Sequence, residues 1–263
     1  MRSQLIWMGL VAASCSLGWM AVVAAAEDPA AGARLDVGGI EQSGGTIQGV
    51  VKFAGKQRSP KSHRVDADKF CAHAHKDAPL LKETFVFGKN DTLQNVFVYI
   101  SDGLKGTFDP PTQPAVISQS GCSYVPHVRG IVVKQTLEIR NDDNTLHNVK
   151  LTSKKNGKEN KGSRKGQVLT KIFKKPEMGV TYKCDVHSWM SAYVHVVSHP
   201  FFAVTQEDGT YEIRGLPPGE YEVSVWHEFA RFAPDKEHVT VTVSEGETAE
   251  VDFIYAPKKK KKG

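Results

Sequence analysis

Three side chains that bind soft metals follow one another at intervals of three residues: Cys184, His187 and Met190. A thiolate and a thioether together select copper or iron–sulfur chemistry, and an imidazole is also a good copper ligand. A mononuclear electron-transfer copper centre is built from two histidines and one cysteine in a plane, with a weak axial methionine. This short segment could therefore supply three of the four ligands of such a centre.

One tight turn cannot surround a metal ion, so the fourth ligand must come from a distant loop. His147 is the candidate, because it follows a polar, turn-forming run at residues 141–145. The compact C-x2-H-x2-M loop, together with an early His followed by Asn, resembles the cupredoxins. The loop is most similar to that of the small type 1 (blue) copper proteins of the amicyanin and plastocyanin kind. The resemblance covers roughly residues 114 to 198.

This resemblance implies a ligand set and a fold. His147 and His187 would bind one copper ion through imidazole nitrogen, Cys184 as thiolate, and Met190 weakly along the axis. Asn148 would tie the two ligand loops together by a side-chain hydrogen bond. The four ligands would meet at one pole of a Greek-key β-sandwich, with His187 in an exposed loop, and the copper would cycle between Cu(I) and Cu(II).

Other metal and cofactor chemistries fit these residues less well. A C-x2-H pair also occurs in zinc sites, and a single cysteine is often only a small buried apolar residue. Met190, as a third ligand at the same spacing, favours a copper site over a zinc site or a buried apolar cysteine. A binuclear copper centre needs a second cysteine in the loop, and a c-type haem needs C-x-x-C-H; the sequence has neither.

Three functions compete for a copper site of this kind. Storage or delivery would favour Met-rich or multi-Cys tracts, but after residue 26 the only methionines are Met178 and Met190. An oxidase or nitrite reductase needs further copper ligands, and His73-x-His75 is an isolated pair. We therefore expect an electron-transfer protein that is not an enzyme. Copper binding and delivery, or a non-catalytic accessory role in a redox enzyme, are the alternatives.

The N-terminal residues predict export. Residues 1–26 carry Arg2, apolar runs and a small-residue end, which is typical of a secretory signal peptide, with acylation at Cys15 as an alternative. Residues 27–45, rich in Ala and Gly, favour a flexible linker. The formal net charge of +5 loses one charge with Arg2 and five with Lys258 to Lys262, so the rest is nearly neutral. We expect a periplasmic or cell-surface protein without a transmembrane segment in the mature chain.

The remaining cysteines predict a disulfide. In an oxidising compartment the partner of Cys71 is Cys122, since the thiol of Cys184 is needed for copper. His73 and His75 would then be surface loop residues, with a weak second metal site left open.

Period-two patterns predict an all-β protein. Strands are expected at 47–53, 84–87 and 96–100, and the cupredoxin-like domain at 113–198 contains the further strands that a small sandwich needs. No stretch has a clear helical period.

A second small β-sandwich is predicted around residues 203–226. Its Asp-Gly turn, its Leu-Pro-Pro-Gly loop and the alternating strand that follows resemble the carboxypeptidase regulatory-like domain, which has a transthyretin-like fold. Residues 49–51 and 95–100 resemble the first strands of such domains. Residues 46–112 and 199–256 are therefore expected to form one sandwich that is split in the sequence. A Lys-rich tail is expected at 257–263. Trp226-His227-Glu228 is interpreted as a core Trp with polar loop residues rather than as an acid–base or metal cluster.

The insert from Ser153 to Lys175 is strongly basic. A patch of one sign steers the encounter with an oppositely charged partner, so this insert favours docking of an acidic redox protein; a solvated loop is the alternative. Nucleic acid is not expected, because the patch has almost no aromatic residues to stack on bases. The candidate docking residues are Lys154, Lys155, Lys158, Lys161, Arg164 and Lys165.

Overall fold

A computed structural model of the chain describes residues 44–57 and 59–258. The predicted signal peptide, nearly all of the predicted linker and the end of the Lys-rich tail lie outside the described residues. β-Strands make up nearly all of the regular structure, which confirms the all-β prediction. None of the helices in the described ranges is long and apolar enough to span a bilayer.

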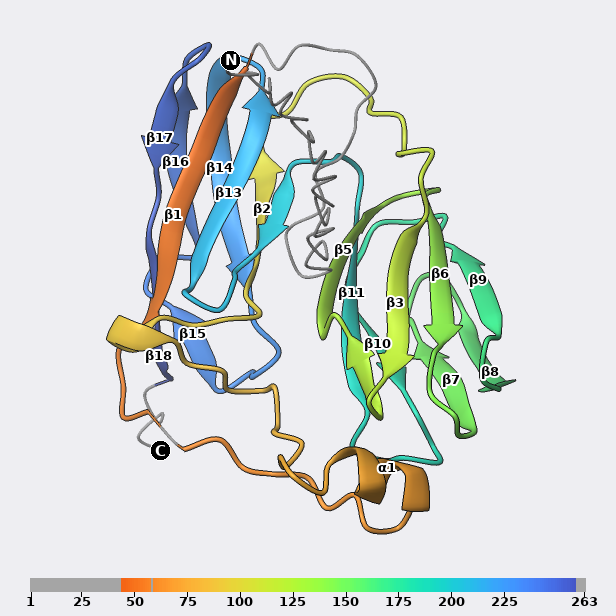
Figure 1. Cartoon of the computed structure of the whole chain (residues 1–263). Coiled ribbons are helices and arrows are strands. Elements are labelled where there is room, and N and C mark those ends of the chain that lie inside the picture. The colour runs from red at the N-terminus through yellow and green to blue at the C-terminus, as the bar shows by residue number, and fades with distance from the viewer. Residues whose placement is uncertain (1–43, 58, 259–263) are drawn as a thin grey trace, which may run out of the picture.

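Strands from the two ends of the described chain form one β-sandwich, called here the outer sandwich (Figure 1). One sheet has the strand order β13-β1-β18-β15, with β17 paired to β1, and the other has the order β12-β2-β14-β16. Each sheet contains strands from both the N-terminal and the C-terminal part of the described chain, because β1 pairs antiparallel with β13 and β2 with β14. The bounds are β1 Gly45–Phe53, β2 Phe97–Asp102, β12 Phe202–Val204, β13 Thr210–Leu216, β14 Gly219–Trp226, β15 Phe232–Pro234, β16 His238–Val243, β17 Thr248–Glu250 and β18 Phe253–Pro257.

Alternating apolar residues explain the core of the outer sandwich. Ile47 and Val51 of β1 point inward and are fully buried, and they pack in one cluster with Ile213 of β13 and Val223 of β14. Burying such a side chain stabilises a fold by about 1.5–3 kcal/mol. The likeness of this sandwich to a carboxypeptidase regulatory-like domain stays a prediction.

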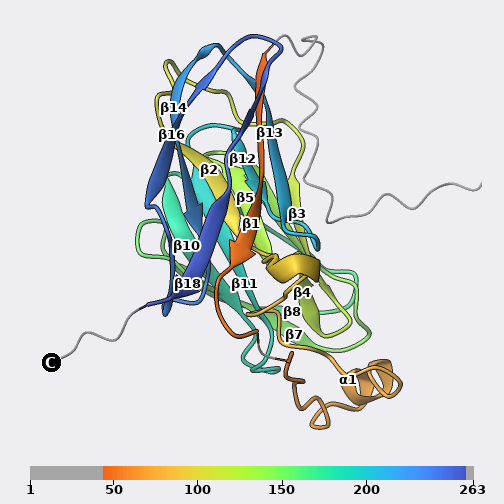
Figure 2. The ribbon, with the colours of Figure 1, turned by 90° about the vertical axis from the view of Figure 1, so that its left-hand side faces the viewer.

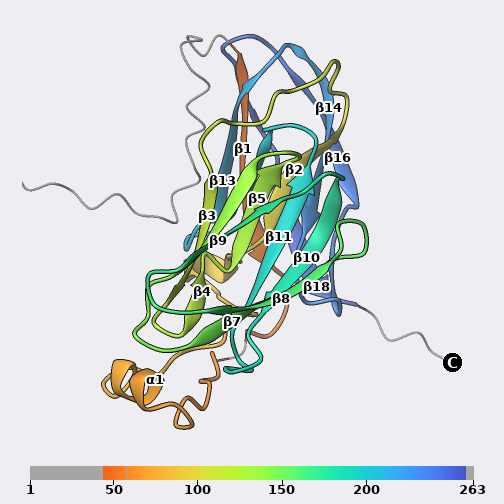
Figure 3. The ribbon, with the colours of Figure 1, turned by 90° about the vertical axis from the view of Figure 1, so that its right-hand side faces the viewer.

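The strands between β2 and β12 in the sequence form a second sandwich with its own core, called here the inserted sandwich. Its sheets have the orders β4-β3-β6-β9 and β5-β11-β10-β7-β8. It lies beside the outer sandwich in Figure 1, and the two overlap along the line of sight in Figures 2 and 3. The bounds are β3 Ala115–Ser120, β4 Ser123–Val125, β5 Val128–Val132, β6 Thr136–Asn141, β7 His147–Thr152, β8 Lys158–Ser163, β9 Val168–Ile172, β10 Glu177–Lys183 and β11 Ser191–Val197.

An aromatic cluster joins the two sandwiches. Phe97 of β2 is fully buried and packs with Val128 of β5 and Val197 of β11. The imidazole of His195, on β11, stacks on Phe97 at 4.3 Å between ring centroids and meets Trp226 of β14 edge-on at 4.2 Å. The contact between the sandwiches is therefore a packed core rather than a wet gap.

A long connection between β1 and β2 leaves the outer sandwich and reaches the far end of the inserted one (Figures 1 and 3). Residues 59–83 of this connection, called here the flap, contain α1 (Lys69–Ala74), and η1 (Lys89–Asp91) follows it. The predicted disulfide is confirmed: Cys71 in α1 is bonded to Cys122 in the turn between β3 and β4. The flap is thus held to the inserted sandwich covalently.

Two local predictions are wrong, and one alternative is excluded. His73 lies in α1 (Lys69–Ala74) rather than in a loop, because Asp68 caps the N-terminus of this helix by accepting hydrogen bonds from Phe70 N and Cys71 N at 2.8 and 3.0 Å. The strand expected at 84–87 is reduced to one isolated bridge, between Phe87 and Leu93. The basic insert is not a loop: β8 pairs with β7 in one sheet and β9 with β6 in the other, and charged side chains are common on such edge strands.

Candidate metal centre

The four predicted ligands are placed at the flap end of the inserted sandwich. His147 is the first residue of β7, Cys184 follows β10, and Met190 directly precedes β11. One ligand atom each from His147, Cys184 and His187 lie within 4.8 Å of one another. The Nδ1 atoms of the two histidines are 2.8 Å apart, and Cys184 Sγ is 3.9 Å from His187 Nδ1.

Met190 is buried in the same core cluster as Cys184 and is 2% exposed. The backbone of this ligand turn is closed by two hydrogen bonds. Met190 N donates to His187 O at 2.9 Å, and Cys184 N donates to Met190 O at 3.3 Å. The turn that carries three candidate ligands is therefore fixed by its own backbone between two strands.

The sulfur of Cys184 is surrounded by donors. Burial alone would raise the pKa of this thiol, but hydrogen bonds from His147 and from backbone N–H groups outweigh burial and lower the pKa. The N–H groups of Asn148 and His187 lie 3.5 and 3.3 Å from Sγ. A lowered thiol pKa favours the thiolate, which is the form of cysteine that binds a metal.

Asn148 connects the two ligand loops. Its Oδ1 accepts a hydrogen bond from Asp185 N at 2.5 Å, and its Nδ2 donates to Asn160 Oδ1 at 2.6 Å on β8. Asp185 in turn forms an ion pair with Lys150 at 2.9 Å. These contacts fix the spacing between the loop that carries His147 and the loop that carries Cys184.

Each candidate histidine ligand has a carboxylate at its outer ring nitrogen. His147 Nε2 donates to Asp143 Oδ2 at 2.9 Å, and His187 Nε2 lies 3.2 Å from Asp68 Oδ2 in the flap. The first contact is a well-formed hydrogen bond, whereas the second has ion-pair distance but poor hydrogen-bond alignment.

Burial and these carboxylates set opposite pKa shifts on the two rings. Burial alone would lower the pKa of His147, but Asp143 and the sulfur of Cys184 raise it to about 9. For His187, burial and repulsion from His147 outweigh Asp68 and lower the pKa. At neutral pH and without metal, His147 therefore carries the extra proton of the pair and His187 is neutral.

The prediction that His187 lies in an exposed loop is wrong. Its ring is 1% exposed and that of His147 is fully buried, because the flap covers this end of the sandwich. Of the neighbouring flap histidines, His73 is exposed and His75 Nε2 contacts Gly121 O at 2.7 Å. Within residues 44–57 and 59–258 neither of them joins a group of metal ligands.

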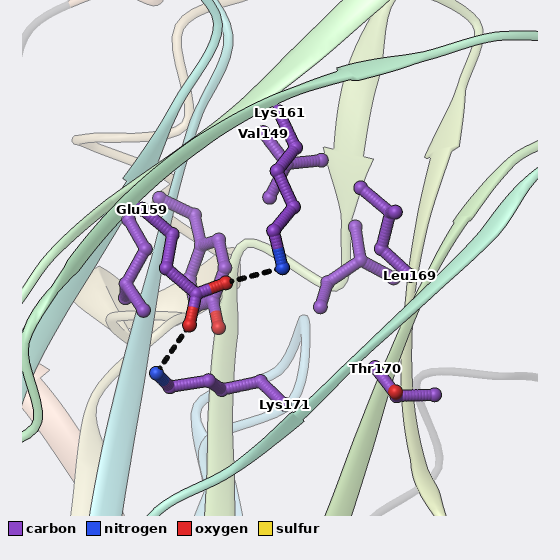
Figure 4. A pocket seen from close by; sticks show the side chains of 9 residues that line it. Val149, Glu159, Lys161, Leu169, Thr170 and Lys171 are labelled. Carbon is purple, nitrogen blue, oxygen red and sulfur yellow. Dashed lines mark hydrogen bonds and ion pairs between the residues drawn. The ribbon is translucent and has the colours of Figure 1, made fainter.

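The candidate docking residues all lie on or beside the edge strand β8. Lys154, Lys155 and Lys158 are exposed, as are Lys161, Arg164 and Lys165. Glu159 lies among them and pairs with Lys161 at 2.9 Å and with Lys171 at 2.5 Å, and these three side chains line one small pocket (Figure 4). The six residues are called here the basic surface, and within the part of the chain that the structure describes only Lys161 among them forms an ion pair.

Sequence reasoning missed a buried ionic cluster between the sandwiches. His127 Nε2 donates to Glu228 Oε1 at 2.8 Å, and His127 Nδ1 lies 3.0 Å from Ser191 O and 3.5 Å from Glu83 Oε2. Glu228 is a loop residue, as expected, but its carboxylate pairs with His127, and neighbouring His227 is buried. The three partners come from distant segments, so no local pattern could have joined them.

Comparison with known proteins gives only distant likenesses. No family model and no curated protein matches the chain. A copper-containing nitrite reductase (NirK) from Thermus scotoductus SA-01 is a similar solved structure, with 22% identity over 37% of this chain and a TM-score of 0.30, and the match spans 25% of that chain. A purple cupredoxin from Nitrosopumilus maritimus has 22% identity over 31% of this chain and 98% of its own, with a TM-score of 0.28.

An amicyanin variant in the Cu(I) state has 18% identity over 38% of this chain and 97% of its own, with a TM-score of 0.29. These solved structures are cupredoxins or contain copper. The nitrite reductase contradicts the expectation that the chain is not an enzyme, and that expectation is withdrawn.

Proposed function

We propose that this protein transfers single electrons through one type 1 copper ion. His147 and His187 would bind it through Nδ1, Cys184 through the thiolate and Met190 as a weak axial ligand. The observation that carries the proposal is the convergence of two imidazole Nδ1 atoms and a thiol at a buried point. The donor set fits the metal, because His₂Cys with Met is the ligand set of electron-transfer copper sites.

When bound, the copper would supply a one-electron couple between Cu(I) and Cu(II). The chain's own residues would keep the ligands in place in both states. Asn148 ties the two ligand loops, and strands β10 and β11 fix both ends of the Cys–His–Met turn. Ligands held on rigid elements move little, so little reorganisation accompanies electron exchange.

Burial of the ligands favours electron transfer without direct binding of a small molecule. The four ligand side chains are at most 3% exposed. The electron would therefore reach a partner through the protein rather than through a bridging ligand. The basic surface on β8 suits an acidic redox protein as that partner, and the proposal includes export, which rests on residues 1–26.

Copper loading followed by absorption and EPR spectroscopy tests the proposal. We expect an intense, reversible blue band that Cys184→Ser abolishes, because the thiolate bond gives this kind of centre its colour. Met190→Gln should keep copper and colour but lower the reduction potential, since an oxygen donor favours Cu(II). Met178→Gln is the matched control, because Met178 is 37% exposed on β10.

Two results would overturn the ligand assignment. One is a blue band that survives Cys184→Ser. The other is a Met190→Gln protein as severely affected as Cys184→Ser, because an axial ligand cannot be as important as the thiolate. Tight, colourless binding of Cu(I) alone would replace electron transfer by copper delivery.

A further inference from the structure

The flap places a carboxylate from a distant part of the chain against a candidate metal ligand. Asp68 and His187 are far apart in sequence, yet Asp68 Oδ2 lies 3.2 Å from His187 Nε2. Thr145 Oγ1 donates to the same carboxylate oxygen at 3.0 Å. The other oxygen, Oδ1, accepts the two backbone hydrogen bonds that cap α1. One side chain thus both starts the flap helix and faces the ring of His187.

The two outer carboxylates belong to one closed set of contacts. Asp143, which accepts from His147 Nε2, also accepts from the backbone N–H groups of Gly121 and Cys122 at 2.7 and 2.8 Å. Cys122 is bonded to Cys71 in the helix that Asp68 caps. The outer nitrogens of both histidines are therefore linked to each other through the flap and its disulfide.

We propose that Asp68 is a positioning residue of the metal centre. It would orient the imidazole of His187 through Nε2, leaving Nδ1 free for the metal, and its negative charge would stabilise Cu(II) relative to Cu(I). Histidine ligands commonly donate their second N–H to a carboxylate, which fixes the ring and raises its basicity. The inference rests on the proposed function, because it concerns the same ligand.

The expected size of the effect of Asp68→Asn on the copper couple follows from the partial exposure of the Asp68 carboxylate. Replacing such an outer partner typically changes metal affinity by about 10–100-fold. The side chain of Asp68 is 23% exposed, so solvent screens its charge and the lower end applies. We expect Asp68→Asn to shift the Cu(I)/Cu(II) ratio at a fixed potential roughly tenfold toward Cu(I). For a one-electron couple this is an upward shift of about 59 mV in reduction potential.

The substitution Asp68→Asn isolates the charge from the fold. Asn caps a helix about as well as Asp, so α1 should persist. The matched control is Asp66→Asn, which removes an exposed carboxylate two residues away that pairs with Arg64. Asp68→Glu restores the charge and should recover part of the shift. Replacing Cys71 and Cys122 together by Ala should also raise the potential, because Asp68 is then no longer held in place.

A second readout does not depend on copper. In the metal-free protein the side-chain ¹⁵N NMR signals of His187 should move with Asp68→Asn and stay in place with Asp66→Asn. If the wild type binds no copper, the proposed function fails while this measurement still tests the contact. If copper binds but Asp68→Asn changes neither the potential nor the His187 signals, the role of Asp68 is refuted and the proposed function stands.

Discussion

His195 should make the contact between the two sandwiches sensitive to acid. Its ring is fully buried against Phe97 and Trp226, and its Nδ1 accepts a hydrogen bond from Gly179 N at 3.2 Å. Burial lowers the pKa of His195 to about 3, so the ring is neutral in the folded protein. An unfolded chain has a histidine pKa of about 6.5. Between these two values the unfolded state binds the proton and the folded state does not.

The sign and size of the effect follow from this difference. The folded-state pKa is depressed, so the contribution to stability is complete above about pH 6.5 and is lost as the pH falls toward 3. One pKa unit corresponds to about 1.4 kcal/mol. Between pH 7 and pH 5 this single ring should therefore cost the folded state about 2 kcal/mol. Buried carboxylates add their own pH dependence, so only a difference between variants isolates the histidine.

His195→Asn removes the titrating ring and keeps an acceptor for Gly179 N. Urea unfolding at pH 7 and pH 5, followed by tryptophan fluorescence, gives the loss of unfolding free energy for each protein. The variant will be less stable at both pH values because the stacked ring is gone, but its loss on acidification should be about 2 kcal/mol smaller than that of the wild type. His238→Asn, at an exposed position on β16, should behave as the wild type. Equal losses in wild type and His195→Asn would show that the ring is already solvated or charged when folded.

Three further outcomes follow from the same structure. Replacing Cys71 and Cys122 by Ala should lower the free energy of unfolding by about 4 kcal/mol on the chain-entropy model, because the two cysteines are 51 residues apart. Denaturant titration measures this loss, and a loss below about 1 kcal/mol would contradict the model. Copper binding at pH 7 should release about one proton from His147, because the pKa of this ring is raised to about 9. Copper affinity should therefore rise as the pH approaches 9. Calorimetry in buffers of different ionisation enthalpy counts the released protons, and zero release would refute His147 as a ligand. Changing the six residues of the basic surface to Ser should slow oxidation by ferricyanide, an anion, and flatten its salt dependence without altering the spectrum, whereas an unchanged rate would leave β8 as an ordinary solvated edge.

The local part of the candidate metal centre could be predicted from sequence, because three of its side chains lie in one turn. Cys184, His187 and Met190 have the spacing of a ligand loop, and only His147 had to be found elsewhere. The all-β fold was predictable for a similar reason, since apolar residues alternate along the strands. The disulfide was predicted because an expected export and a metal role for Cys184 left Cys71 and Cys122 as the pair.

The covering of the centre could not be predicted in this way. The contact of Asp68 with His187 joins residues on separate elements, and α1 has only six residues, too short for a helical period to show. The one available signal was an Asp at an N-cap position directly before Lys69 and Phe70. Similarly, His127 and Glu228 become partners only because the inserted sandwich packs on the outer one.

The flap and the metal centre should influence each other equally, because a coupling free energy between two sites is reciprocal. If the charge of Asp68 stabilises Cu(II), then Cu(II) must stabilise the docked flap by the same factor relative to Cu(I). Backbone amides of α1 should therefore exchange with solvent faster in the reduced protein than in the oxidised one, by up to about tenfold, the factor taken for Asp68→Asn. Hydrogen exchange of residues 70–75 measures this, and the difference should vanish in Asp68→Asn. Equal exchange in both oxidation states of the wild type would mean that the carboxylate lies beside the ligand without acting on it.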